Sequence, residues 1–250
     1  MNFPQPDIFD PANARDLCLA SAASYQSRAA AEQISLWSGA TDTRVLITVR
    51  DNDLIVAFRG TQDLRNWVTD LDCEFVRLGG ARVHRGFHQA LHSVWDDLER
   101  VIASQARARL WLTGHSLGGA LAMLFAWRCE RWVDGLYTFG QPRVGDAHFA
   151  ESYGYGGLKF RTFRVVHADD IVPRVPWLLG RYRHAGHEVF CPSPSSFQLD
   201  RPWFTRLPSD LRGLADELHR GRLALLDHHH IKGYLALFPG RSAATSVSLS

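Results

Sequence analysis

One stretch decides the fold: residues 109–131, which read RLWLTGHSLGGALAMLFAWRCER. Residues 109–113 are mostly apolar and predict a short buried strand, and residues 117–131 predict a core helix. A Gly-x-Ser-x-Gly turn centred on Ser116 joins the two. A sharp strand–turn–helix of this kind exposes a serine hydroxyl at the edge of a sheet. The order of the three parts therefore makes Ser116 the candidate nucleophile of an α/β sheet.

The turn itself is a weaker signal than its surroundings, because the bare Gly-x-Ser-x-Gly pattern arises by chance in about one chain in ten of this size. The alternative is a glycine-rich turn whose Ser116 merely caps a core helix. The strand before the turn and the helix after it favour a nucleophile, because the helix N-terminus directs free N–H groups at the reacting group. We expect His115 to be a structural neighbour, since adjacent residues on such a turn point in different directions.

Strand and helix patterns alternate along the rest of the chain. We predict helices at residues 10–26, 86–103 and 147–153, and strands at residues 44–50, 54–59, 136–139, 160–166 and 187–191. The first two strands form a hairpin, residues 192–208 are irregular, and residues 242–250 form a frayed tail. The pattern predicts an α/β fold in which a mostly parallel twisted sheet is flanked by helices. We expect one domain over residues 1–250.

Composition excludes several classes of function. The chain carries 28 Lys and Arg against 26 Asp and Glu, a net charge of +2, and the charges are interspersed. A nucleic-acid-binding protein would show a concentrated basic stripe, so no nucleic-acid partner is expected. No cysteine lies in a Cys-x-x-Cys pair, which argues against zinc or redox chemistry and favours buried free thiols over a disulfide pair. The four cysteines are Cys18, Cys73, Cys129 and Cys191.

The N-terminal residues 1–7 show no basic stretch followed by an apolar core, so they do not have the pattern of a signal peptide. The longest apolar runs, such as residues 121–127, are too short to span a bilayer. We therefore expect a protein without a transmembrane segment that stays in the cytoplasm, unless a non-classical route exports it.

Five separated segments resemble one family. They are FRGT at residues 58–61, VHRGF at 83–87, GHSLGGA at 114–120, TFGQPRVG at 138–145 and DIVPR at 170–174. Together they are similar to the class 3 (fungal-type) lipases. The resemblance implies the α/β-hydrolase fold and a serine carboxylester hydrolase with a Ser-His-Asp triad. It implies no metal and no organic cofactor.

The acid of such a triad follows the nucleophile along the chain, and the base follows the acid. Asp170 resembles the family's catalytic aspartate in the pattern His-x-x-Asp-x-Val-Pro. It also follows a predicted strand, which places it at the carboxyl end of the sheet, where ligands bind in folds of this kind. Asp169 is the alternative, and only the matched pattern separates the two.

The base is expected within DHHHIKGY, residues 227–234, which resembles the family's terminal histidine motif. The His-x-Ile-x-x-Tyr alignment selects His229, with His228 and His230 as alternatives. A metal site is not expected, because consecutive histidines point in different directions around a helix. Two other histidines follow the acid but resemble a structural segment of the family, with Glu188 as a partner: His184 and His187.

The expected chemistry is acyl transfer through Ser116. His229 accepts the hydroxyl proton as the oxygen attacks an ester carbonyl, and Asp170 orients the imidazole and stabilises its charged form. The tetrahedral oxyanion needs two donors in place. One is the backbone N–H of Leu117 at the helix start. The other, by resemblance to the family's Arg-Gly-Ser/Thr segment, is Thr61.

Residues 62–71 occupy the position of the family's lid and have the apolar spacing of an amphipathic helix. Such a lid covers the site in water and makes transient contact with a lipid interface. An ordinary surface helix packed on the core fits the same spacing. The resemblance implies an acyl-lipid ester substrate, with triacylglycerol lipase the usual assignment. A phospholipase, a short-chain esterase, an acyltransferase and a non-catalytic lipid-binding protein of this fold are the alternatives.

Overall fold

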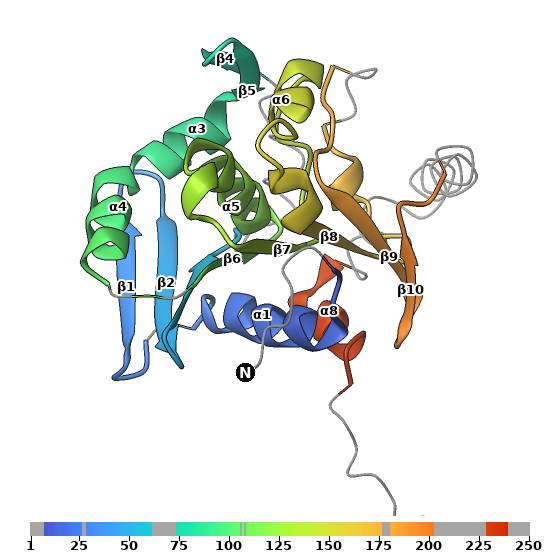
Figure 1. Ribbon diagram of the computed structural model, residues 1–250, viewed down its shortest axis with the longest axis horizontal. Helices are drawn as coiled ribbons and strands as arrows, with labels where there is room; N and C mark the ends of the chain where they lie inside the picture. The colour runs from blue at the N-terminus through green and yellow to red at the C-terminus, as the bar shows by residue number, and fades with distance from the viewer. Residues whose placement is uncertain are drawn as a thin grey trace, which may run out of the picture.

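The computed structural model describes residues 8–26, 29–61, 74–105, 107, 109–176, 181–202 and 229–239. An eight-stranded sheet forms the centre of the molecule (Figure 1). In spatial order its strands are β1 (Gln33–Ser38), β2 (Thr43–Arg50), β3 (Asp53–Phe58), β6 (Arg109–His115), β7 (Gly135–Phe139), β8 (Thr162–His167), β9 (His187–Ser193) and β10 (Ser196–Leu199). The segment from β3 to β9 is parallel, and the strands outside it are antiparallel. The predicted fold class is therefore confirmed.

The register of the parallel strands brings their carboxyl ends to one edge. Phe58 at the end of β3 pairs with Gly114, and His115 at the end of β6 pairs with Phe139 at the end of β7. The predicted hairpin precedes them, since β2 and β3 pair antiparallel around a turn at Asp51 and Asn52. The segments that leave these carboxyl ends are therefore neighbours in space, whatever their separation in sequence.

Helices cover both faces of the sheet (Figure 1). One face carries α1 (Pro11–Ala23) and α8 (Ile231–Ala236), which pack on each other and on the middle strands. The opposite face carries α3 (Arg85–His92), α4 (Trp95–Ser104), α5 (Leu117–Arg128) and α6 (Ala147–Ser152). A separate two-stranded ribbon consists of β4 (Phe75–Leu78) and β5 (Ala81–His84). Among the described residues, the other helical elements are the short 3-10 turns η1 (Glu130–Trp132), η2 (Leu158–Arg161) and η3 (Val172–Arg174).

Each face has its own apolar core because the side chains of a strand alternate between the two faces. Leu112 of β6 packs with the α5 side, and Trp111 packs with the α1 and α8 side. Within α5 the nine residues from Gly118 to Ala126 are all buried, so this helix is apolar all round, as the sequence predicted for a core helix. No helix among the described residues is long and apolar enough to cross a membrane.

The first predicted helix is confirmed as α1, and local chemistry explains where it begins. The Asp10 side chain accepts a hydrogen bond from the Ala12 backbone N–H at 2.7 Å, and Pro11 occupies the first helical position. The buried face of α1 includes Leu17 and Cys18. Its last residue is Ala23, and Ser24 caps the C-terminus.

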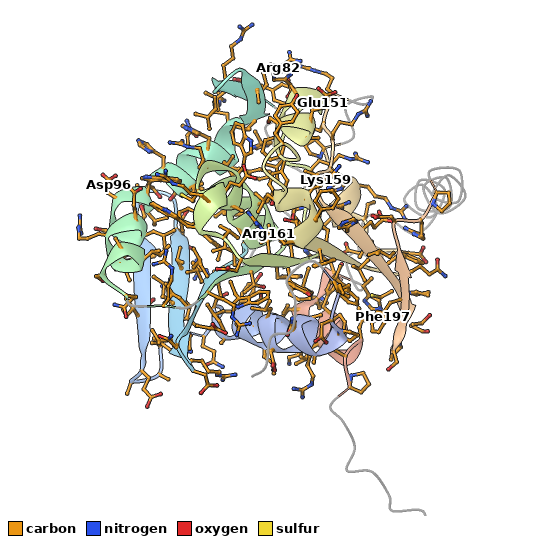
Figure 2. The ribbon with its side chains drawn as sticks, viewed as in Figure 1. Arg82, Asp96, Glu151, Lys159, Arg161 and Phe197 are labelled. Atoms are coloured by element: carbon orange, nitrogen blue, oxygen red, sulfur yellow. The ribbon has the colours of Figure 1, made fainter. Side chains whose placement is uncertain are left out.

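The structure differs from the sequence prediction in three places. Residues 86–103 form two helices, α3 and α4, rather than one, because the backbone leaves the helical conformation at Val94, with φ −122° and ψ 3°. The strands β1, β4, β5 and β10 were not predicted. Residues 192–208 are not irregular at their start, because β9 continues into this stretch and turns back as β10. Phe197 of β10 (Figure 2) stacks on Phe238 at 5.5 Å.

Three of the four cysteines are buried free thiols, as predicted: Cys18, Cys129 and Cys191. Burial raises the pKa of the Cys129 thiol to about 11 and that of the Cys191 thiol to about 12. Cys73, the lid candidate at residues 62–71 and the tail at 242–250 lie outside the described residues. The single domain over residues 1–250 stays a prediction.

Candidate active site

Ser116 lies at the junction between β6 and α5 in a backbone conformation that is rare for a residue with a side chain. Its φ is 59° and its ψ is −130°, and its N–H donates to the Phe139 carbonyl at 2.9 Å. Strain of this kind persists only where the surroundings hold it, and it concentrates at functional sites. The Ser116 side chain makes no capping hydrogen bond to α5. The alternative in which this serine merely caps the helix is therefore not what the structure shows.

Asp170 follows the end of β8 and is completely buried. Its Oδ1 accepts a hydrogen bond from the Val172 backbone N–H at 2.9 Å. Its Oδ2 accepts from the Tyr234 hydroxyl and lies 2.7 Å from His229 Nδ1. The neighbouring Asp169 is exposed. The structure thus brings Asp170, and not its neighbour, against a histidine.

His229 is 1% exposed and immediately precedes the turn into α8. Because its Nδ1 faces the Asp170 carboxylate, which only accepts, we assign the ring proton to Nδ1 and the lone pair to Nε2. Among the described residues, neither His229 Nε2 nor Ser116 Oγ has a hydrogen-bond partner, although both are buried. The site therefore holds one unused acceptor and one unused hydroxyl at the same edge of the sheet.

The other histidine candidates lie elsewhere. His230 is exposed, and His228 is outside the described residues. His184 Nε2 contacts the Pro173 carbonyl at 2.7 Å. His187 takes Asp200 as its carboxylate partner at 2.5 Å, while Glu188 pairs with Arg201. The expected pairing of these histidines with Glu188 is thus replaced, for His187, by a pairing with Asp200.

Gly140 shows how tightly the end of β7 is packed against this pair. Its φ is +61°, and a Cβ added there would lie 2.7 Å from His229 Cε1 and 2.9 Å from Asp170 Oδ2. Only a glycine gives both the backbone conformation and the space. The backbone at the end of β7 thus packs directly against both the acid and the histidine.

The two residues predicted to hold the oxyanion belong to segments that reach Ser116. Leu117 is the first residue of α5, whose first N–H groups have no partner within the helix. Thr61 follows Gly60, whose added Cβ would lie 3.2 Å from Ser116 Cβ. The preceding Arg59 is buried and bonds Asp42 Oδ2 at 2.6 Å. This buried guanidinium fixes the segment that leads to Thr61.

Sequence reasoning missed two tyrosines of the site. Tyr234 was used only as a landmark of the histidine motif, yet its hydroxyl donates to Asp170. Burial and the Asp170 carboxylate raise the pKa of Tyr234 well above its usual value, so it stays a donor. Tyr25 contacts His115 Nδ1 at 2.8 Å from the end of α1. No local pattern indicates Tyr25, because 90 residues separate it from its partner.

Comparison with known proteins assigns the family. The family model described as lipase (class 3) matches residues 55–179, half of the 250-residue chain. The chain belongs to the class 3 lipase family. A lipase of Rhizomucor miehei is 34% identical over 66% of this chain and 50% of its own length. A secreted mono- and diacylglycerol lipase of Fusarium solani is 35% identical over 55% of this chain and 44% of its own.

A similar solved structure agrees with the fold. It is a triacylglycerol lipase whose catalytic centre is described as a serine protease triad, with a TM-score of 0.66 and 27% identity. The match covers 75% of this chain and 83% of that one. The chain nevertheless spans only about half the length of the curated relatives it matches, 50% and 44% for the two named above.

The predicted cytoplasmic location is wrong by this comparison, because the Fusarium solani relative is named a secreted lipase. The absence of a leader pattern in the first residues was a negative signal and carried no information on location. The described residues contain no group of three or more His, Cys, Asp or Glu side chains that could hold a metal ion.

Proposed function

We propose that this protein is a serine carboxylester hydrolase that acts on acyl-lipid esters, with triacylglycerol as the substrate class. One observation carries the proposal: the buried Asp170–His229 pair leaves Nε2 unpartnered, and Ser116, strained and at the same edge of the sheet, has an unpartnered hydroxyl too. A buried polar group without a partner costs free energy, about 1–3 kcal/mol, and needs an explanation. Acid–base work on a bound ester supplies that explanation for both atoms.

In the proposed reaction, His229 Nε2 takes the Ser116 proton while Oγ attacks the ester carbonyl carbon. The carbonyl oxygen becomes an oxyanion, which the N–H groups of Leu117 and Thr61 stabilise. The tetrahedral intermediate expels the alcohol, which receives the proton from His229 and leaves an acyl-enzyme. Water then attacks the acyl carbon while His229 takes a proton from it. The second tetrahedral intermediate releases the fatty acid, and His229 returns the proton to Ser116 Oγ. Asp170 keeps the imidazole oriented and offsets its positive charge throughout.

The lipid part of the proposal has a different support. The family match and the printed names of the relatives, triacylglycerol lipase and secreted mono- and diacylglycerol lipase, favour acylglycerols and a site of action outside the cell. We also propose that residues 62–71 act as a lid that makes transient contact with a lipid interface. A partial acylglycerol is the second candidate substrate, because the Fusarium solani relative is named for it.

The test begins with a fluorophosphonate probe on the full chain, with Ser116→Ala as the control. We expect covalent labelling at Ser116 and none in the variant. A panel of p-nitrophenyl and glycerol esters then defines the acyl length and the number of acyl chains. Failure to label, together with unchanged ester turnover by Ser116→Ala, rejects Ser116 as the nucleophile and with it the proposed serine hydrolase. A profile that falls steeply beyond butyrate rejects the lipid substrate and keeps the hydrolase.

A further inference from the structure

Hydrogen bonds link Tyr25 and His115, which are not part of the proposed triad, to the backbone of His229. His115 is buried, and its Nε2 lies 2.6 Å from the backbone carbonyl oxygen of His229. Its Nδ1 lies 2.8 Å from the Tyr25 hydroxyl. The His115 and His229 rings are also in contact, with centroids 4.5 Å apart. One side chain therefore touches both the backbone of the proposed base and the end of α1.

The direction of these bonds follows from their partners. A carbonyl oxygen only accepts, so the proton of His115 must sit on Nε2. In a neutral ring Nδ1 is then an acceptor, and the Tyr25 hydroxyl must donate to it. Burial raises the pKa of Tyr25, which keeps the hydroxyl protonated for that bond.

Tyr25 also lies against the oxyanion segment, because its hydroxyl faces the Gly60 backbone. A Cβ on Gly60 would overlap this hydroxyl and would lie 2.6 Å from the His115 carbonyl oxygen. The residue after Gly60 is Thr61, the proposed oxyanion donor.

We propose that Tyr25 and His115 are positioning residues, which hold the oxyanion segment, the nucleophile turn and the backbone of the base in register. Gly60 lies against the Tyr25 hydroxyl, the Tyr25 O–H donates to His115, and the His115 N–H donates to the His229 carbonyl. The inference rests on the proposed function, because it concerns the groups that this function assigns to catalysis.

These hydrogen bonds require a neutral His115. The groups that face its ring are Tyr25, His229, His230 and Tyr234. None of them is a carboxylate, and burial together with the two neighbouring histidines lowers the pKa of His115 well below its usual value. A protonated ring would donate from both nitrogens and lose the bond from Tyr25. The positive charge that forms in catalysis therefore stays on His229, which faces Asp170.

A matched control contacts the other end of the same helix. Tyr137 holds the opposite end of α1, because its buried hydroxyl accepts from the Asp10 backbone N–H at 3.2 Å. If the Tyr25 hydroxyl only fastens α1 to the sheet, Tyr25→Phe and Tyr137→Phe will behave alike. If Tyr25 positions catalytic groups, only the first substitution will lower turnover.

The experiment compares wild type, Tyr25→Phe, Tyr137→Phe and Ser116→Ala on soluble p-nitrophenyl butyrate, with Tm measured for each. We expect Tyr25→Phe to lower kcat about tenfold, as for loss of about 1.4 kcal/mol of transition-state stabilisation, with little change in KM. Tyr137→Phe should keep the wild-type kcat. Equal kcat values for the two tyrosine variants would overturn the inference. Wild-type turnover by Ser116→Ala would reject the proposed function itself.

A second measurement uses the wild-type protein and needs no variant to fold. The 15N shifts of the histidine rings report which nitrogen carries the proton. We expect His115 to hold its proton on Nε2 and to titrate well below its ordinary pKa. A proton on Nδ1, or titration at or above the ordinary pKa, would overturn the assignment of donors on which the chain depends.

Discussion

One buried ion pair at the amino end of the parallel strands contrasts with two buried reactive atoms at their carboxyl end. At the amino end, Asp53 of β3 is 2% exposed and takes both Nε and Nη2 of Arg109 at 3.0 and 2.7 Å. At the carboxyl end, Ser116 Oγ and His229 Nε2 are buried without partners among the described residues. The same sheet thus pairs a buried charge at one edge and leaves reactive atoms unused at the other.

The difference shows where stability and function divide. Removing one partner of a paired buried charge destabilises a protein, whereas an unused buried acceptor costs free energy in the resting protein. The carboxyl end adds a strained Ser116, which the rest of the fold must offset. Substitutions at the two ends should therefore separate activity from stability.

The largest expected effect comes from His229→Ala at the carboxyl end. Loss of the base leaves Ser116 without a proton acceptor, so kcat should fall by about a million-fold, as when a comparable triad histidine is removed. The measurement is ester hydrolysis at saturating substrate, with folding checked by Tm. His187→Ala is the control, because this histidine follows Asp170 in sequence but pairs with Asp200. Equal activity of the two variants would remove His229 from the mechanism.

The predictable part of the molecule is the part whose signal is local. The strand–turn–helix around Ser116 and the capped start of α1 follow from residues adjacent in sequence. The break between α3 and α4 does not, because residues 90–97 contain no glycine or proline to mark the turn at Val94. The edge strand β1 was missed because only Ile34, Leu36 and Trp37 of its six residues are apolar, and two of these are exposed.

The site divides in the same way. Motif and chain order selected Asp170 and His229, and the structure places these two in contact. The chain through Tyr25 and His115 was beyond sequence reasoning, because it joins the end of α1, the end of β3 and the start of α8. Such partners are set by tertiary packing, which brings together residues that no short pattern relates.

The next effect is expected at the amino end, where Asp53→Asn removes the charge that faces Arg109. The free energy of unfolding should fall by about 2 kcal/mol, because hydrogen bonds to a charged group are lost next to a partly buried guanidinium. The value of kcat at 25 °C should stay at the wild-type level. Asp97→Asn, which breaks an exposed pair with Arg100, should change stability far less. A loss of kcat in Asp53→Asn would contradict the expectation that the amino end affects stability and not activity.

The smallest expected effect tests a paired charge near the carboxyl end. Asp146 caps α6 and bonds Arg82 of β5 (Figure 2) at 2.8 Å. Burial alone would raise the pKa of Asp146, but Arg82 and the Phe149 N–H outweigh it and lower that pKa. A depressed pKa in the folded state gives stability above the unfolded value of about 3.9, and that stability is lost as the pH falls through the folded pKa.

Asp146→Asn isolates this charge, because asparagine caps a helix about as well as aspartate. Half of the Arg82 side chain is exposed, so the variant should lose less than about 1 kcal/mol at neutral pH. The Tm difference from wild type should shrink as the pH falls below about 4, where the wild-type carboxylate protonates. Thermal melts across this range, with kcat measured at neutral pH, provide the check. A Tm difference that grows in acid would contradict the lowered pKa of Asp146 in the folded protein. A loss of kcat would show that Asp146 also affects catalysis.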